Sequence, residues 1–238
     1  MTMAEMAPTN AEPPPPSTPP STPPLLPPPL PPLLHDADDL LVFDKPAGLL
    51  CQPGLGAEQA DSLISRVQRR WPEGRLVHRL DRDTSGLLLV ARTAALHRQL
   101  SELFARRQVR KTYIAAVRGL PVQPSGRIAL AIAKRQHRPP LYGADPAGKP
   151  SLTHWRRWGM VSLQGCSRLV LHPLTGRSHQ LRVHLQAIGH PILGDPLYGV
   201  IAADREQGIG RMHLHAAGLC FQHPISGAVL RLRAPCPF

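Results

Sequence analysis

The first 34 residues restrict the fold more than any other part of the chain. About half of the 29 prolines lie there, many in unbroken runs at 13–16, 27–29 and 31–32. Because proline has no backbone N–H to donate, so proline-rich a segment cannot form a hydrogen-bonded core. We expect residues 1–34 to be a disordered, partly polyproline II tail that is dispensable, and residues 35–238 to form the folded domain.

The folded part carries a large positive charge. Glu5 and Glu12 are the only charged residues of the tail, so residues 35–238 hold 28 Lys and Arg against 14 acidic residues, a formal charge of +14. A surface so basic favours a polyanionic partner, which it attracts over long range and holds through salt-dependent phosphate contacts. Nucleic acid is the first candidate for that partner, and an anionic membrane surface is the second.

The sequence contains no signal for a membrane or an oxidising compartment. No apolar run is long enough to span a bilayer, and residues 1–10 lack the basic and apolar regions of a signal peptide. The cysteines are widely spaced and form no Cys-x-x-Cys pair. We therefore expect a cytoplasmic protein with reduced, mostly buried thiols at Cys51, Cys166, Cys220 and Cys236.

Apolar spacing predicts several strands separated by a few helices. The period of 3.6 residues predicts amphipathic helices over 58–71, from about 93, and from a cap at Thr175 or Ser178 to Gly189. Runs of strands with few helices favour an α+β domain built on a large mixed sheet. The segment 136–150 is interpreted as a loop that could lie against RNA. Strands are predicted over 40–43, 87–90, 109–117, 127–133, two stretches within 152–171, and a hairpin of 212–221 with 228–232.

The stretch 78–86, with the sequence HRLDRDTSG, places one carboxylate between two arginines just before an apolar strand. Cationic neighbours hold a carboxylate in its charged form, so Asp81 could act as a nucleophile or a base. A salt-bridged loop entering a strand would show the same local pattern. Asp83 is placed equally well, but two adjacent loop carboxylates in a chain that is 4% aromatic are a poor basis for a glycosidase.

Other familiar catalytic patterns are absent from the sequence. We find no GxSxG nucleophile elbow, no phosphate-binding loop, no GxGxxG and no HExxH. The 12 histidines lack the paired Cys or carboxylate spacing of a closed zinc site, so we expect no metal. In the second dense stretch, 171–184, the predicted helix would direct Arg182 into a cleft near its start.

Several long motifs in one order resemble the RluA-type pseudouridine synthases over roughly residues 38–238. They are DKPAG at 44–48, HRLDRDTSG at 78–86, KTY at 111–113, GRSHQLRVH at 176–184, GHPILGDPLY at 189–198 and LHA at 214–216. The resemblance implies the pseudouridine synthase fold, with a mainly antiparallel sheet and a central RNA-binding cleft. It also implies an isomerase that detaches uracil from a uridine and rejoins it through a ring carbon, without a cofactor.

The resemblance assigns a role to five residues. Asp81 would be the catalytic carboxylate, and Arg182 would pair with it. Tyr113 would lie against the target ring and aid proton removal. Arg79 would help to extrude the target base, and Leu181 would add apolar packing in the same pocket. Asp83 then becomes a structural contact in the turn, and Lys45, His184 and His215 are expected to be structural.

The RNA target remains open at this stage. The chain has no counterpart of the amino-terminal S4-type domain that many ribosomal relatives carry, and compact relatives imply a dual target. That target is a transfer-RNA anticodon stem-loop together with a ribosomal RNA hairpin of similar shape. The alternatives are a synthase acting on large-subunit ribosomal RNA only, a non-catalytic RNA-binding or RNA-folding protein, and a protein that binds anionic membranes.

Overall fold

The structure, a computed structural model, describes residues 28–137, 140–160 and 165–238. The tail expected over 1–34 lies mostly outside the described residues, but its last residues belong to the domain. Strand β1 (Leu33–Asp36) pairs with β2 (Leu40–Lys45), and Leu30 packs on the same apolar cluster as Leu33. The boundary expected at residue 34 therefore falls inside β1.

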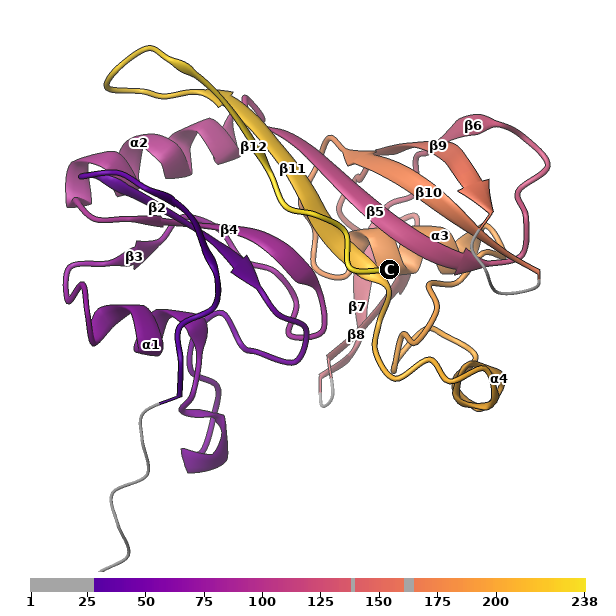
Figure 1. The fold of residues 1–238 in the computed structure, drawn as a ribbon. Coiled ribbons are helices and arrows are strands. Elements are labelled where there is room, and N and C mark those ends of the chain that lie inside the picture. Colours follow the sequence, from indigo (N-terminus) through magenta and orange to yellow (C-terminus); the bar gives the residue numbers. More distant parts are fainter. Residues whose placement is uncertain (1–27, 138–139, 161–164) are drawn as a thin grey trace, which may run out of the picture.

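A ten-stranded mixed sheet forms the centre of the domain (Figure 1). Its main path runs β1-β2-β4-β11-β5-β10-β9-β6, with β3 on β4 and β12 on β11. Among the strands in the described ranges, only β4 and β11 pair in parallel, so the predicted α+β class with a large, mainly antiparallel sheet is confirmed. The strands are β3 (Arg75–Leu76), β4 (Ser85–Ala91), β5 (Arg110–Arg118), β6 (Ser125–Ile128), β9 (Thr153–Met160), β10 (Cys166–Pro173), β11 (Leu214–Gln222) and β12 (Val229–Arg233).

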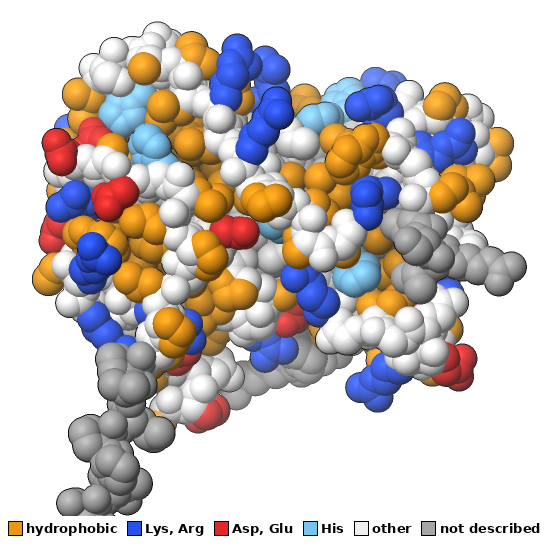
Figure 2. All heavy atoms as spheres, in the orientation of Figure 1, with side chains coloured by type: hydrophobic (Ala, Val, Ile, Leu, Met, Phe, Trp, Pro, Cys, Tyr) orange, Lys and Arg blue, Asp and Glu red, His pale blue; other side chains and the backbone are white. Residues whose placement is uncertain are grey.

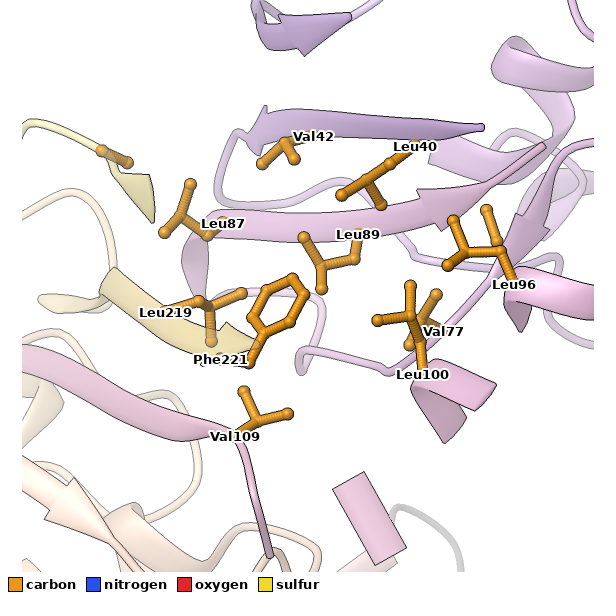
Figure 3. Close-up of a cluster of buried hydrophobic side chains, with 12 residues drawn as sticks. Leu40, Val42, Val77, Leu87, Leu89, Leu96, Leu100, Val109, Leu219 and Phe221 are labelled. Carbon is orange, nitrogen blue, oxygen red and sulfur yellow. The ribbon is translucent and has the colours of Figure 1, made fainter. Parts of the chain in front are cut away.

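Strand β4 has helices or strands on both faces, which explains its unbroken apolar sequence. All seven of its residues are buried. Leu87 and Leu89 face a cluster that includes Phe221 from β11 and Leu100 from α2 (Ala94–Ala105), as Figure 3 shows. On the other face, Leu88 and Val90 pack with α1 (Leu63–Gln68). A strand buried on both faces loses the polar and apolar alternation of a half-exposed strand.

Gly86 fixes where the HRLDRDTSG loop enters the sheet. Its φ is +110°, a region that side chains rarely adopt, and a Cβ at this position would overlap the backbone of Ala216 in β11. The parallel pairing of β4 with β11 begins there, at Ser85 with His215 and Gly86 with Ala216. The end of the loop is therefore held against the middle of the sheet.

Helices α1 and α3 differ from their predicted starts. The helix predicted over 58–71 is only α1, because Ser62 caps it with a reciprocal bond to Ser65, and the preceding residues form a short 3₁₀ turn (Ala57–Gln59). Helix α3 (Gln180–Ala187) begins after His179, whose φ is +54°, so the predicted caps Thr175 and Ser178 were wrong. Helix α4 (Ile201–Glu206) was not predicted.

The segment predicted as a loop over 136–150 is partly a hairpin. Strand β7 (Ile132–His137) pairs with β8 (Pro140–Ala144) in a separate two-stranded sheet. The single strand predicted over 127–133 is also wrong, since β6 joins the large sheet and β7 the small one. Sequence periodicity could not detect the change of partner sheet at residues 129–131, because each half is compatible with a strand.

The cysteines were predicted to be reduced and mostly buried, and two of the four are buried. None of the four cysteines forms a disulfide, and Cys51 and Cys166 are buried while Cys220 and Cys236 are half-buried. No helix within the described ranges is long and apolar enough to cross a membrane.

Candidate active site

The five residues singled out in the sequence lie around one cleft of about 130 Å³. Arg79 and Asp81 come from the loop before β4, and Tyr113 comes from β5. Leu181 and Arg182 come from the first turn of α3. Residues separated by up to about a hundred positions in the chain therefore meet at one surface. Its polar lining also includes Lys111, Thr175 and His179.

Arg182 links Asp81 in the cleft to a second carboxylate, Asp195. Arg182 Nη1 lies 3.1 Å from Asp81 Oδ2. The other two nitrogens, Nε and Nη2, each donate a 2.7 Å hydrogen bond to Asp195, whose side chain is fully buried. Burial alone would lower the pKa of Arg182, but its bonds to Asp195, with a smaller contribution from Asp81, raise that pKa overall. Arg182 therefore stays charged, and its three hydrogen bonds orient it beside Asp81.

A second contact reaches Asp81 from the start of α3. His179 Nε2 lies 3.9 Å from Asp81 Oδ2, and its Nδ1 lies 2.8 Å from the Tyr198 hydroxyl. That hydroxyl accepts a hydrogen bond from the backbone N–H of Tyr142, and its own proton is available to His179 Nδ1. Burial lowers the pKa of His179. If Tyr198 donates to Nδ1, the neutral ring carries its hydrogen on Nε2, facing Asp81.

Tyr113 is protonated in the free site. Its side chain lines the cleft, and burial, followed by the negative charge of Asp81, raises the pKa of its hydroxyl. Tyr113 therefore presents a flat ring and a hydrogen-bond donor at neutral pH, but no ready base.

The DKPAG motif supports the loop that bears Asp81. Lys45 is fully buried, and its ammonium donates to the backbone carbonyls of Pro46, Leu49 and Arg82 at 2.7–2.8 Å. Burial lowers the pKa of Lys45 to about 8. From the other side, the Cys51 thiol bonds the backbone of Leu80. Both residues next to Asp81 in the chain are thus held from outside the loop.

Two histidines of the motifs contact residues outside the cleft. His184 bonds Ser151 and Thr153, and His215 lies 2.9 Å from Ser85. Neither these histidines nor Lys45 line the cleft, and the structural roles expected for them stay a prediction. Within the described ranges, no group of three His, Cys, Asp or Glu side chains is placed to hold a metal ion.

Sequence reasoning missed Asp195, His179 and Tyr198 as functional residues. All three stood inside the motifs of the second half of the chain, but their spacing gave no reason to bring them to Asp81. The one available signal was chemical: a buried arginine needs a carboxylate, and Asp195 follows an apolar stretch. The left-handed backbone of His179, which turns its ring toward the loop, has no sequence signature.

Comparisons with known proteins identify the family of this chain. The model of the RNA pseudouridylate synthase family matches residues 39–187. The dual-specificity RNA pseudouridine synthase RluA of Escherichia coli K12 is 40% identical over 207 residues, which cover 87% of this chain and 93% of that protein. The protein of the same name from Yersinia pestis is 40% identical over 209 residues, with 87% and 99% covered.

Solved structures show the same fold. Human RNA pseudouridylate synthase domain containing 1 superposes with a TM-score of 0.73 at 32% identity, over 87% of this chain and 83% of that one. The chain belongs to the RNA pseudouridylate synthase family. Within that family it is an RluA-type synthase, an isomerase that converts uridine in RNA to pseudouridine.

Proposed function

We propose that this synthase modifies a uridine in a transfer-RNA anticodon stem-loop and in a ribosomal RNA hairpin of similar shape. Asp81 is the catalytic carboxylate, oriented by Arg182. The observation that carries the proposal is the chain Asp195–Arg182–Asp81, which ends at the cleft beside Tyr113. The names of the RluA relatives support the dual target, since both are called dual-specificity enzymes.

Access to the target requires base flipping. The glycosidic bond of a uridine in a folded loop is unreachable until the base leaves the stack, at a cost of a few kcal/mol. Arg79 is exposed at the rim of the cleft, where its guanidinium can fill the vacated space or hold the neighbouring phosphates. Leu181, which is buried in the same cleft, supplies an apolar surface for the extruded ring.

The reaction breaks the bond between the sugar C1′ and uracil N1 and forms a bond between C1′ and C5. The hydrogen on C5 leaves as a proton, and N1 gains one. The Asp81 carboxylate faces the sugar carbon as nucleophile or electrostatic stabiliser. Tyr113 stacks on the ring and, because it holds its proton in the free site, enters the proton transfer first as a donor. No atom is oxidised and no external water is consumed, so the proposal needs no cofactor.

The basic hairpin β7–β8 supports an RNA substrate larger than one nucleotide. Exposed Lys134 and Arg135 lie on β7. The hairpin also contacts the residue before α3, because the ring of Tyr142 lies edge-on to that of His179 with 5.1 Å between the ring centroids. Because the hairpin β7–β8 connects the cleft with a basic surface, it can contact the phosphates of an RNA stem-loop whose target base is in the cleft. The proposal includes neither a membrane nor an obligate protein partner. We place the reaction in the cytoplasm, which is supported by four cysteines without a disulfide.

The test is to incubate the protein with unmodified transfer RNA and ribosomal RNA transcripts and to map pseudouridine. We expect one modified position in an anticodon stem-loop and one in a ribosomal hairpin. Modification of ribosomal RNA alone would support the single-target alternative. Tight binding with every uridine left intact would overturn the catalytic assignment in favour of a non-catalytic RNA-binding protein.

A further inference from the structure

One side of the sheet faces away from the cleft. Along β5 and β10 the side chains alternate, and Tyr113, Ala115, Leu169 and Leu171 face the cluster that contains α3. The alternate positions of the same strands face the opposite side. Leu193, Ile209 and Phe238 cover that side near Ala116 and Cys166. Figure 1 shows the rest of these strands without a helix in front of them.

Arg118 at the end of β5 pairs with Asp204 of α4. The rest of this open side, which we call the outer face, carries six arginines that form no ion pair within the described residues. They occupy positions that alternate with core residues, such as Arg168 beside Leu169 in β10 and Arg127 beside Ile128 in β6. None of the strands β5, β6, β9, β10, β11 and β12 contains Asp or Glu. Figure 2 shows blue and pale-blue side chains over the upper and right parts of this face, and red side chains nearer its middle, its left and its lower edge. The arginines are Arg110, Arg127, Arg156, Arg168, Arg231 and Arg233.

The register of the strands gathers part of this charge at one groove. Arg110 in β5 and Arg231 in β12 both pair with Cys220 of the intervening β11. Two strand spacings put their backbones about 10 Å apart. A groove of about 460 Å³ is lined by Arg110, Arg231 and Arg233 and by the aromatic side chain of Trp158.

Trp158 adds an aromatic platform to the charged groove. Its side chain is 53% exposed, and the Arg168 guanidinium lies 5.6 Å from its ring centroid. It lies at the irregularity where β9 and β10 shift register, which turns this ring to the outer face. Arginines that follow a phosphate backbone, next to an aromatic ring that can stack on a base, are typical of single-stranded RNA binding.

We propose that the outer face binds a second segment of the substrate RNA, outside the hairpin that enters the cleft. The inference rests on the proposed function, because it takes the same RNA as the ligand. Six guanidinium groups without a carboxylate repel one another, and a phosphodiester chain neutralises them with release of its counterions. The face lies on the opposite side of the sheet from Tyr113, so a minimal stem-loop held in the cleft leaves the outer face empty.

The experiment compares a whole unmodified transfer-RNA transcript with its isolated anticodon stem-loop. One variant carries Arg110→Ala, Arg231→Ala and Arg233→Ala, and an independent second variant carries Arg127→Ala and Arg156→Ala. A control, matched in charge to the first, carries Arg69→Ala, Arg75→Ala and Arg98→Ala, which are exposed around α1, β3 and α2. Affinity, KM and kcat are measured for both RNAs, with the dependence of affinity on salt.

For the whole transcript we expect the first variant to raise Kd and KM on the order of tenfold with kcat unchanged, and to reduce the salt slope by about 2–3. For the isolated stem-loop, Kd and KM of the first variant stay within about twofold of the wild type. This RNA has no phosphates beyond the hairpin that could contact the outer face. The second variant also raises Kd and KM for the whole transcript, by a smaller factor because it removes fewer arginines. If the first variant does not fold, the second variant alone tests the outer face.

Equal losses in the control, or a whole-transcript affinity unchanged in both outer-face variants, would overturn the inference. A wild-type protein that modifies neither RNA would refute the proposed target instead. The affinity comparison still tests the outer face in that case, since binding is measured without turnover.

Discussion

Arg182 binds Asp195 through two nitrogens and Asp81 through the third, so one buried carboxylate positions the arginine for another. Asp195→Asn removes the buried negative charge but keeps the volume. Removing one partner of a buried ion pair costs about 3–5 kcal/mol, and we expect that loss in urea unfolding together with a large fall in kcat. The control, Asp145→Asn, breaks a more exposed pair with Arg135 and should cost less than about 1 kcal/mol. Wild-type stability and kcat in Asp195→Asn would contradict the role given to this pair.

Asp81→Asn should abolish turnover and leave RNA affinity intact. The amide keeps the shape of the cleft but removes the charge that the chemistry requires. Asp83→Asn is the matched control, because Asp83 lies two positions away and pairs with the exposed Arg82 at 3.2 Å. Single-turnover rates and RNA binding should be measured for both. The assignment fails if Asp81→Asn turns over at a rate near that of the wild type.

Tyr198→Phe tests the orientation of His179. It removes the hydroxyl that lies 2.8 Å from His179 Nδ1 but keeps the ring that lies 5.0 Å from the Arg182 guanidinium. Loss of one hydrogen bond of about 1 kcal/mol corresponds to about a fivefold fall in kcat. Nitrogen-15 NMR should show His179 protonated on Nε2 in the wild type and a mixture of tautomers in the variant. His179→Gln, which retains a donor, should keep more activity than His179→Ala; identical tautomers in wild type and Tyr198→Phe would refute this arrangement.

His78 should make the protein sensitive to acid. Burial, with a smaller effect from Lys111, lowers the pKa of His78 to about 3 from 6.5. Its Nε2 accepts a hydrogen bond from the N–H of Leu89, and its ring stacks on Phe104. The unfolded state then binds a proton that the folded state does not between pH 6.5 and 3. Stability is therefore complete above pH 6.5 and falls as pH drops through this window.

His78→Gln is the matching variant, because its amide oxygen can accept the same bond without titrating. The slope of the unfolding free energy between pH 6 and 4 should decrease by about 1.4 kcal/mol per pH unit relative to the wild type. Urea unfolding at several pH values provides the measurement. Equal slopes in the two proteins would show that His78 binds the same number of protons in the folded and unfolded states over this pH range.

Two deletions should separate the tail from the domain. We expect removal of residues 1–27 to leave stability and turnover close to those of the full chain. Removal of residues 1–36 should destabilise it, since it eliminates β1, the bond from Asp44 N–H to the Pro32 carbonyl, and the bond from Arg66 to the Pro29 carbonyl. Thermal unfolding of both proteins checks this, and a large loss from the shorter deletion would contradict the dispensable role of the tail.

The parts of the fold that depend on local pattern were predictable. The strand at 87–90 is buried on both faces and reads as an unbroken apolar run, and the hairpin of β11 and β12 has its turn residues between two β-prone stretches. The hairpin β7–β8 was wrongly taken for a loop, because its prolines and glycines are equally typical of both.

By itself, the sequence determined the α+β class, the basic character of the domain, and the residues that resemble a synthase, because each of these depends on composition or on neighbours in the chain. Tertiary structure decided which of the charged groups meet. It brought Asp195 behind Arg182, directed His179 at Asp81, and separated the cleft from an outer face of arginines that alternate with core residues. Contacts between distant residues depend on strand order and register, and a local pattern in the chain encodes neither.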